Sequence, residues 1–81
     1  MNMKDTVALM LSDDYKERFK AEYWQLRNRY NKLVDMLDRM DDGTLKFTPT
    51  CPRSTYYLQI NSMKDYLAIL EARAVMERVE L

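Results

Sequence analysis

The 81-residue sequence contains no histidine, one cysteine, one glycine and two prolines. Without histidine, the chain lacks the commonest general base near neutral pH and every Ser-His or Cys-His nucleophilic pair. A single cysteine forms no intrachain disulfide, and without histidine or a second cysteine no zinc site of the usual ligand types can be assembled. These absences predict a protein that is not an enzyme and that uses no metal or other cofactor.

Charge and hydropathy exclude further classes. Thirteen Lys and Arg residues balance thirteen Asp and Glu residues, whereas proteins that bind long nucleic acids carry an excess of positive charge. The apolar run Val7–Leu11 is too short for a secretion signal or a membrane span, which indicates a cytoplasmic protein with no membrane partner. A chain of this length buries only about 60% of the surface that its unfolded form exposes, so its core alone gives marginal stability. With disulfides and metal sites excluded, oligomerisation is the remaining way to stabilise the fold.

The longest organised segment is predicted to be a helix over residues 13–41. Ser12 is a suitable N-cap, and Gly43 stands where a helix usually stops. No glycine or proline interrupts the chain between them. Apolar residues recur there at alternating spacings of four and three, which is typical of one helix face that packs on another helix: Phe19, Tyr23, Leu26, Tyr30, Leu33, Leu37 and Met40.

An extended, proline-containing connector is predicted over residues 42–51, followed by a second helix over residues 52–79. Leu45 and Phe47 alternate with polar residues, so both side chains are expected to fold back onto the helices. Pro52 suits the first position of the second helix. That helix carries a matching apolar seam, made of Tyr56, Ile60, Met63, Leu67, Leu70 and Ala74.

Two long helices with matching seams and a short connector predict an all-α fold, an antiparallel two-helix hairpin over residues 12–81. Residues 1–11 are interpreted as either a mobile tail or a short helix that covers part of the open face. A hairpin has one internal interface, so the apolar residues outside the seams need another partner. A homo-oligomer is therefore predicted, with candidate interface residues Tyr56, Tyr57, Tyr66, Ile69 and Met76.

The N-terminus of the second helix is the main candidate for a binding site. Free backbone N–H groups at that point, together with Lys46, Arg53 and Ser54, can hold a phosphate group. The alternative is that Ser54 and Thr55 cap the helix and Arg53 is a solvated surface residue. Tyr15 and Trp24 on the first helix are candidates for stacking on a ligand or for an oligomer interface.

Two further features are interpreted as structural. Cys51 has no partner base, so it is taken for a small apolar group and not for a reactive thiol. Asp41 and Asp42 lack the spaced ligands of a calcium loop, and they are interpreted as a solvated helix end. Neither feature predicts a metal site.

Two phrases connect the chain to a known family. The sequence reads FTPTCP in the connector and YLAILEARA in the second helix. Over Leu9–Leu81 it resembles a small family found in phages and in integrated elements of gut bacteria, related to a crAss-like phage protein. This resemblance implies a phage or mobile-element origin.

A more distant resemblance bears on function. The layout of a helix, a connector that ends in CPRS at 51–54, and a second helix with Ala-Arg-Ala at 72–74 resembles the hairpin domain of phage sponge proteins. Those sponges counter CBASS and Thoeris immunity by sequestering cyclic nucleotide signals in pockets between subunits. Residues 55 and 56 depart from the Arg and Glu that the sponge pattern often has there. The resemblance implies three ligand-binding candidates: Arg53, Ser54 and Arg73.

The first functional hypothesis is a non-catalytic, phage-encoded binding protein that sequesters a small anionic cyclic nucleotide in the cytoplasm of an infected or lysogenic bacterium. The second is a protein–protein inhibitor of a host defence complex, comparable to an anti-CRISPR protein, which would present its exposed apolar face to the host partner. A helical phage accessory or structural protein is the third interpretation.

Overall fold

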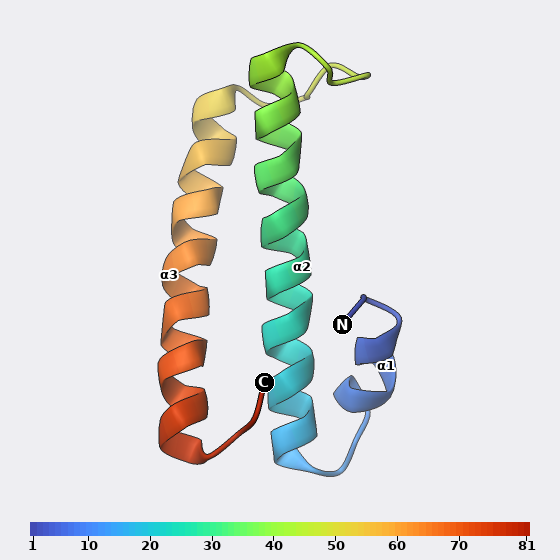
Figure 1. The fold of residues 1–81 in the computed structure, drawn as a ribbon, viewed down its shortest axis with the longest axis vertical. Helices are drawn as coiled ribbons and strands as arrows, with labels where there is room; N and C mark the ends of the chain where they lie inside the picture. Colours follow the sequence, from blue (N-terminus) through green and yellow to red (C-terminus); the bar gives the residue numbers. More distant parts are fainter.

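The computed structural model describes all 81 residues. It contains α1 (Asp5–Met10), α2 (Tyr15–Asp42) and α3 (Arg53–Glu77). α2 and α3 run antiparallel side by side, and α1 lies against the N-terminal half of α2 on the side away from α3 (Figure 1). The predicted all-α hairpin is confirmed, and of the two interpretations of residues 1–11 the short helix is correct. None of the helices has the length and apolar character needed to cross a membrane.

The long helices begin slightly later than predicted because other residues cap them. Asp14, in extended backbone, is the N-cap of α2, and its carboxylate accepts the backbone N–H of Lys16 at 2.9 Å. Ser12 does not cap the helix, since its hydroxyl accepts the backbone N–H of Asp14 at 3.0 Å and forms the preceding turn. Pro52 is the N-cap of α3 and not its first residue, because its ψ of 149° is extended.

The two predicted seams form the interface between α2 and α3. Their buried members lie mainly in the N-terminal half of α2 and the C-terminal half of α3, and the other seam residues are half-buried. Each fully buried side chain of this size contributes about 1.5–3 kcal/mol to stability. The largest core cluster consists of Phe19, Tyr23, Leu67, Leu70, Ala74 and Val79.

α1 is held on α2 by a buried polar contact. The hydroxyl of Thr6, which is fully buried, donates to the backbone carbonyl of Met3 at 2.7 Å and accepts from Nε2 of Gln25 at 3.0 Å. Asn2 and Asp5 exchange hydrogen bonds between backbone and side chain and so stabilise the first turn. α1 therefore covers part of α2, while the outer face of α3 stays open.

The connector departs from its predicted placement. Leu45 is half-buried, because the left-handed Gly43 turns the chain and the N–H of Leu45 then donates to the Arg39 carbonyl at 3.2 Å. The expectation for Phe47 is wrong: its side chain is 60% exposed. Cys51 is free and exposed, so it does not serve as an apolar group of the core. The chain bends at residues 46–47 and again at 50–51, and both side chains lie on the solvent side of this segment.

The C-terminal end of α3 uses an unusual cap. Arg78 takes the left-handed conformation, with φ 58° and ψ 47°, at a position where glycine is usual. The backbone N–H of Val79 then donates to the Ala74 carbonyl at 2.8 Å, and the Val79 side chain is buried in the core. The last residues turn back toward α2 (Figure 1), where Nζ of Lys16 donates to the Arg78 carbonyl at 3.2 Å.

Arg78→Gly is expected to stabilise the protein. A left-handed conformation costs a residue with a Cβ about 1 kcal/mol that glycine avoids, which corresponds to a rise in Tm of about 4–8 °C for a domain of this size. Calorimetry at one fixed protein concentration would measure the change. The control is Arg29→Gly, at an exposed position inside α2, which should lower the Tm by a similar amount. A lower Tm for Arg78→Gly would contradict the prediction.

Candidate functional site

The first turn of α3 presents free backbone donors to solvent. The N-cap, Pro52, has no side-chain acceptor, and no side chain caps this helix. The first backbone hydrogen bond runs from the Thr55 N–H to the Pro52 carbonyl at 3.0 Å. The N–H groups of Arg53 and Ser54 are therefore free, at the positive end of the helix dipole. The alternative interpretation, in which Ser54 caps the helix, is wrong.

A depression of about 450 Å³ opens beside this turn and is called here the helix-end pocket; it is lined by Arg53, Ser54, Tyr57 and Leu58. Its volume lies in the range of small-molecule sites. Tyr57 and Leu58 are 53% and 67% exposed, so an aromatic ring and an aliphatic chain lie next to the free donors. The pocket thus combines a place for an anion with a surface for a planar group.

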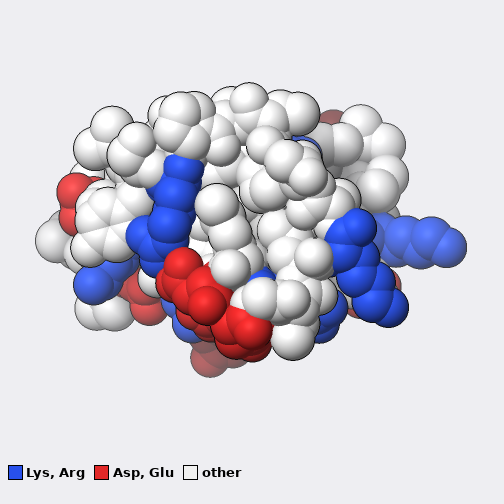
Figure 2. Space-filling view, turned by 90° about the horizontal axis from the view of Figure 1, so that it is seen from above, with Lys and Arg blue, Asp and Glu red and all other residues white.

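Arg53 does not offer a free positive charge to this pocket. Its Nε and one terminal nitrogen donate to the two carboxylate oxygens of Asp41 at 2.9 and 2.7 Å. These hydrogen bonds lower the pKa of Asp41 and raise the pKa of Arg53, so both groups stay ionised and offset each other. Acidic side chains gather beside basic ones at this end of the hairpin (Figure 2). Lys46 on the connector is exposed and forms no ion pair.

Two other candidates, Tyr15 and Arg73, lie at the opposite end of the hairpin. Arg53 and Arg73 are twenty residues apart on one helix, which separates them by about 30 Å. Arg73 donates to Glu77 and to the Tyr15 hydroxyl, both at 2.8 Å, and the Tyr15 hydroxyl donates to Glu77 at 2.7 Å. The Arg73 guanidinium also lies 5.0 Å from the centre of the Phe19 ring. A single chain therefore cannot bring all predicted ligand-binding residues to one site.

This network at the far end shifts the pKa of each member. The hydrogen bonds from Tyr15 and then Arg73 lower the pKa of Glu77, and the bond to Glu77 raises the pKa of Tyr15. Arg73 has a raised pKa, chiefly because of its bond to Glu77. The cluster joins the start of α2 to the end of α3.

The remaining aromatic candidates differ in their exposure. Trp24 is half-buried and meets the Tyr23 ring edge to face at 5.1 Å between ring centres. Tyr56 is half-buried, and its hydroxyl accepts the Cys51 N–H at 3.3 Å. Tyr66 is exposed, but its hydroxyl donates to Glu22 on α2. Among the predicted interface residues, those most exposed are Tyr57, Ile69 and Met76.

A groove between α2 and α3 was not predicted from the sequence. Two depressions of about 430 and 330 Å³ adjoin at Arg29, which lines both. Arg29 and Lys32 are exposed and form no ion pair, while Arg18 donates to the Ser12 carbonyl at 2.8 Å. We call these two depressions together the basic groove, after Arg18, Arg29 and Lys32. Its position could have been predicted from the sequence, because residues separated by eleven and by three positions lie on one face of a helix.

No three His, Cys, Asp or Glu side chains lie close enough together to hold a metal ion. Asp41 is bound to Arg53. Asp42 accepts hydrogen bonds from the hydroxyl and the backbone N–H of Thr44, and these bonds lower its pKa. Both carboxylates therefore have partners within the chain.

A protein-family model described as Sequestin matches residues 13–76. That stretch runs from just before α2 to the last turn of α3, so it takes in the whole hairpin and leaves α1 outside. Searches of curated proteins and of solved structures gave no match.

Glu77→Gln is expected to destabilise the protein more at pH 7 than at pH 3. The pKa of Glu77 in the folded protein is lowered from its ordinary value of 4.5, so folding favours the ionised carboxylate. At pH values above the unfolded-state pKa, this carboxylate therefore stabilises the folded protein. That contribution is lost as the pH falls through the folded-state pKa. The difference in urea midpoint between the two proteins should therefore shrink as the pH is lowered.

The matched control for this experiment is Glu71→Gln, at an exposed α3 position without an ion pair. It should change the urea midpoint little at either pH. A difference between wild type and Glu77→Gln that has the same size at pH 3 and pH 7 would contradict the prediction.

Proposed function

Since the chain belongs to the Sequestin family, we propose that it holds its ligand in the helix-end pocket. Sequestins are phage proteins that sequester signalling molecules, cyclic nucleotides, to counter host defence, and they are not catalytic. The prediction of a non-catalytic phage protein that sequesters a cyclic nucleotide is confirmed by this membership. The proposal adds where on the hairpin the nucleotide binds.

The uncapped first turn of α3 is the observation that carries this proposal. A phosphate of the ligand accepts hydrogen bonds from the free N–H groups of Arg53 and Ser54, with the Ser54 hydroxyl as a further donor. The base stacks on the exposed ring of Tyr57. Arg53 forms an ion pair with Asp41, which offsets its positive charge. The pocket therefore recognises the phosphate through directed hydrogen bonds more than through net charge.

The basic groove is the weaker candidate, although it has the freer cations. Its one aromatic side chain, Tyr66, is hydrogen-bonded to Glu22. Glu22 also places a negative charge in the groove, which opposes a phosphate. A nucleotide in the groove would therefore lose both a free stacking surface and part of the attraction that Arg29 provides.

We further propose that the protein acts as a homo-oligomer in the cytoplasm of the infected or lysogenic bacterium. Large apolar side chains on α3 stay exposed in the single chain, including Val75 and Met76, and association would bury them. Three other residues were predicted from the sequence to bind the ligand: Tyr15, Trp24 and Arg73. Within one chain they lie far from the helix-end pocket, so they can reach a nucleotide there only from another subunit.

Ser54→Glu is expected to abolish ligand binding without harming the fold. A carboxylate in the first turn of a helix is favourable by about 0.3–1 kcal/mol, so the Tm without ligand should hold or rise. The same carboxylate repels a phosphate in the helix-end pocket. Wild-type protein should gain about 2.7 kcal/mol from a bound ligand at one hundred times its Kd. Thermal shift with a panel of cyclic di- and trinucleotides and TIR-derived signals would measure both effects.

Two controls make this test specific. Thr55→Glu adds the same charge to the same turn but at a residue that does not line the pocket, so it should weaken binding less than Ser54→Glu does. Arg29→Ala removes the free cation of the basic groove and should also leave binding intact. Loss of binding in Arg29→Ala with full binding in Ser54→Glu would place the ligand in the groove and contradict the proposed site. A panel without any effect on the wild-type Tm would contradict the proposed ligand class.

A further inference from the structure

A second depression adjoins the helix-end pocket at Tyr57 and is called here the inner pocket. It has a volume of about 230 Å³ and lies between the second half of α2 and the start of α3. Arg53 and Tyr57 line both pockets, so the two depressions meet at these side chains. The walls of the inner pocket are mostly apolar, and they consist of Tyr30, Val34, Leu37, Tyr57 and Ile60.

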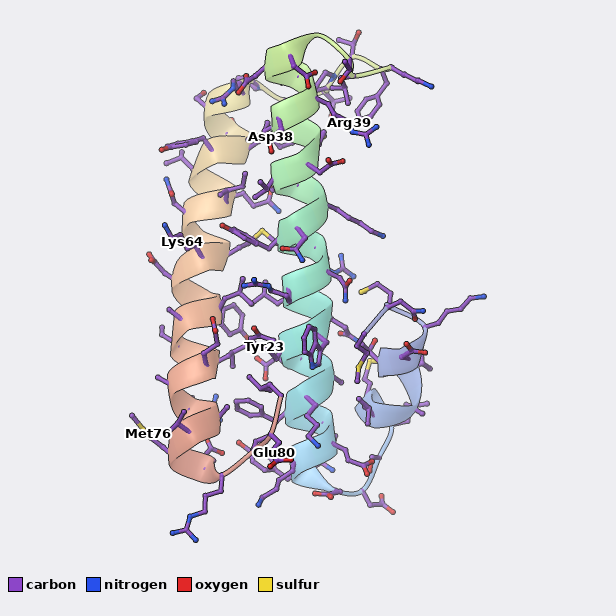
Figure 3. The ribbon with its side chains drawn as sticks, in the orientation of Figure 1. Tyr23, Asp38, Arg39, Lys64, Met76 and Glu80 are labelled. Atoms are coloured by element: carbon purple, nitrogen blue, oxygen red, sulfur yellow. The ribbon has the colours of Figure 1, made fainter.

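Asp38 is the one carboxylate that lines the inner pocket. It lies on the side of α2 that faces α3 (Figure 3), is exposed and forms no ion pair within the chain. The pKa of Arg53 is raised chiefly by its hydrogen bond to Asp41, and the charge of Asp38 adds to this effect. Asp38 is therefore close to the Arg53 guanidinium, but Asp41 occupies that group with two hydrogen bonds. Both oxygens of Asp38 thus remain available to a ligand.

A free carboxylate distinguishes nucleobases by the donors that they present. It only accepts hydrogen bonds, and its two oxygens accept best from two adjacent N–H groups. The Watson–Crick edge of guanine carries two such groups, N1–H and the 2-amino group. On adenine and cytosine the amino group stands beside a ring nitrogen that is itself an acceptor, and uracil has a single N–H between two carbonyl groups. Guanine is therefore the base that fits a free carboxylate best.

The charge of Asp38 also determines which way round a nucleotide lies. A phosphate in the inner pocket would be repelled by this carboxylate, whereas at the first turn of α3 it meets free backbone N–H groups. Arg53 and Tyr57 are four residues apart, which is about 6 Å along the helix axis. One nucleotide spans that distance between its phosphate and its base. The volume of the inner pocket lies below the usual range for a whole ligand, so it fits the base alone.

We propose that Asp38 selects guanine and that the ligand is a cyclic nucleotide with at least one guanine base. This inference rests on the proposed function, because it takes the phosphate to lie in the helix-end pocket. The base stacks on Tyr57, and its N1–H and 2-amino groups donate to the two oxygens of Asp38. The apolar walls of the inner pocket shield these hydrogen bonds from water and so strengthen them.

Asp38→Asn tests this inference through a change in base preference. Asparagine has nearly the shape of aspartate, but an amide nitrogen that donates replaces one of the two acceptor oxygens. It therefore fits adenine, which presents an amino group beside the acceptor N1. Wild-type protein should bind cyclic di-GMP about tenfold or more tightly than cyclic di-AMP, and Asp38→Asn should lower this ratio by a similar factor. Isothermal titration calorimetry measures both affinities, and circular dichroism checks that the variant, changed at an exposed helix position, keeps its helices.

Two comparisons separate base recognition from an effect of charge. Asp65→Asn removes the same charge at an exposed α3 position that lines none of the pockets and forms no ion pair, so it should keep the wild-type ratio. Cyclic di-IMP lacks the 2-amino group and should bind wild-type protein about tenfold more weakly than cyclic di-GMP. A carboxylate that acts through its charge alone would instead change the affinity for all three ligands by one factor, and that result would overturn the inference.

Further outcomes distinguish this inference from the proposed function. Wild-type protein that binds cyclic di-AMP as tightly as cyclic di-GMP, or a ratio that Asp38→Asn leaves unchanged, would overturn the selection of guanine. If Ser54→Glu still abolished that binding, the proposed function would stand. Binding only of nucleotides without guanine would likewise contradict the inference and retain the function. Wild-type protein that binds no member of the nucleotide panel would contradict both.

Discussion

The packing of α2 against α3 is the interaction on which the rest of this molecule depends. With no disulfide and no metal site, the apolar seam between the two helices supplies the stability of a chain that is short for an independent domain. Two helices share one interface, so each must expose the rest of its surface. On α2 part of that surface is covered by α1. On α3 the apolar residues remain open, and this open face is what gives the protein a surface for association.

The ion pairs within the chain limit how it can recognise an anion. Arg53 and Arg73 each form close hydrogen bonds with a carboxylate, at opposite ends of the hairpin. A phosphate in the helix-end pocket meets free backbone donors, whose positions are set by the helix itself. Such donors favour a ligand of defined shape over anions in general. This agrees with the balanced charge of the sequence and with a protein that holds one class of small signal.

Much of the fold could be predicted from the sequence, because the spacing of apolar residues is a local property of each helix. Both seams were located in this way, and so was the turn at Gly43. The exposure of Phe47 depends on the direction in which the connector leaves the helices, which no local pattern encodes. The pairing of Arg53 with Asp41 joins the start of one helix to the end of another. The α1 contact likewise joins Thr6 to Gln25, far along the chain, and a buried threonine has no sequence signature.

The site was predictable to the same degree. The free donors at the start of α3 follow from a proline before the helix, which is visible in the sequence. The shape of the helix-end pocket and the separation of Tyr15 and Arg73 from it required the geometry of the hairpin. One feature of that geometry also makes the molecule convenient to study. Cys51 is the chain's one thiol, is exposed and stands two residues before Arg53. A dye attached there through a maleimide would label every chain once, beside the pocket, and its fluorescence would register events at that end alone.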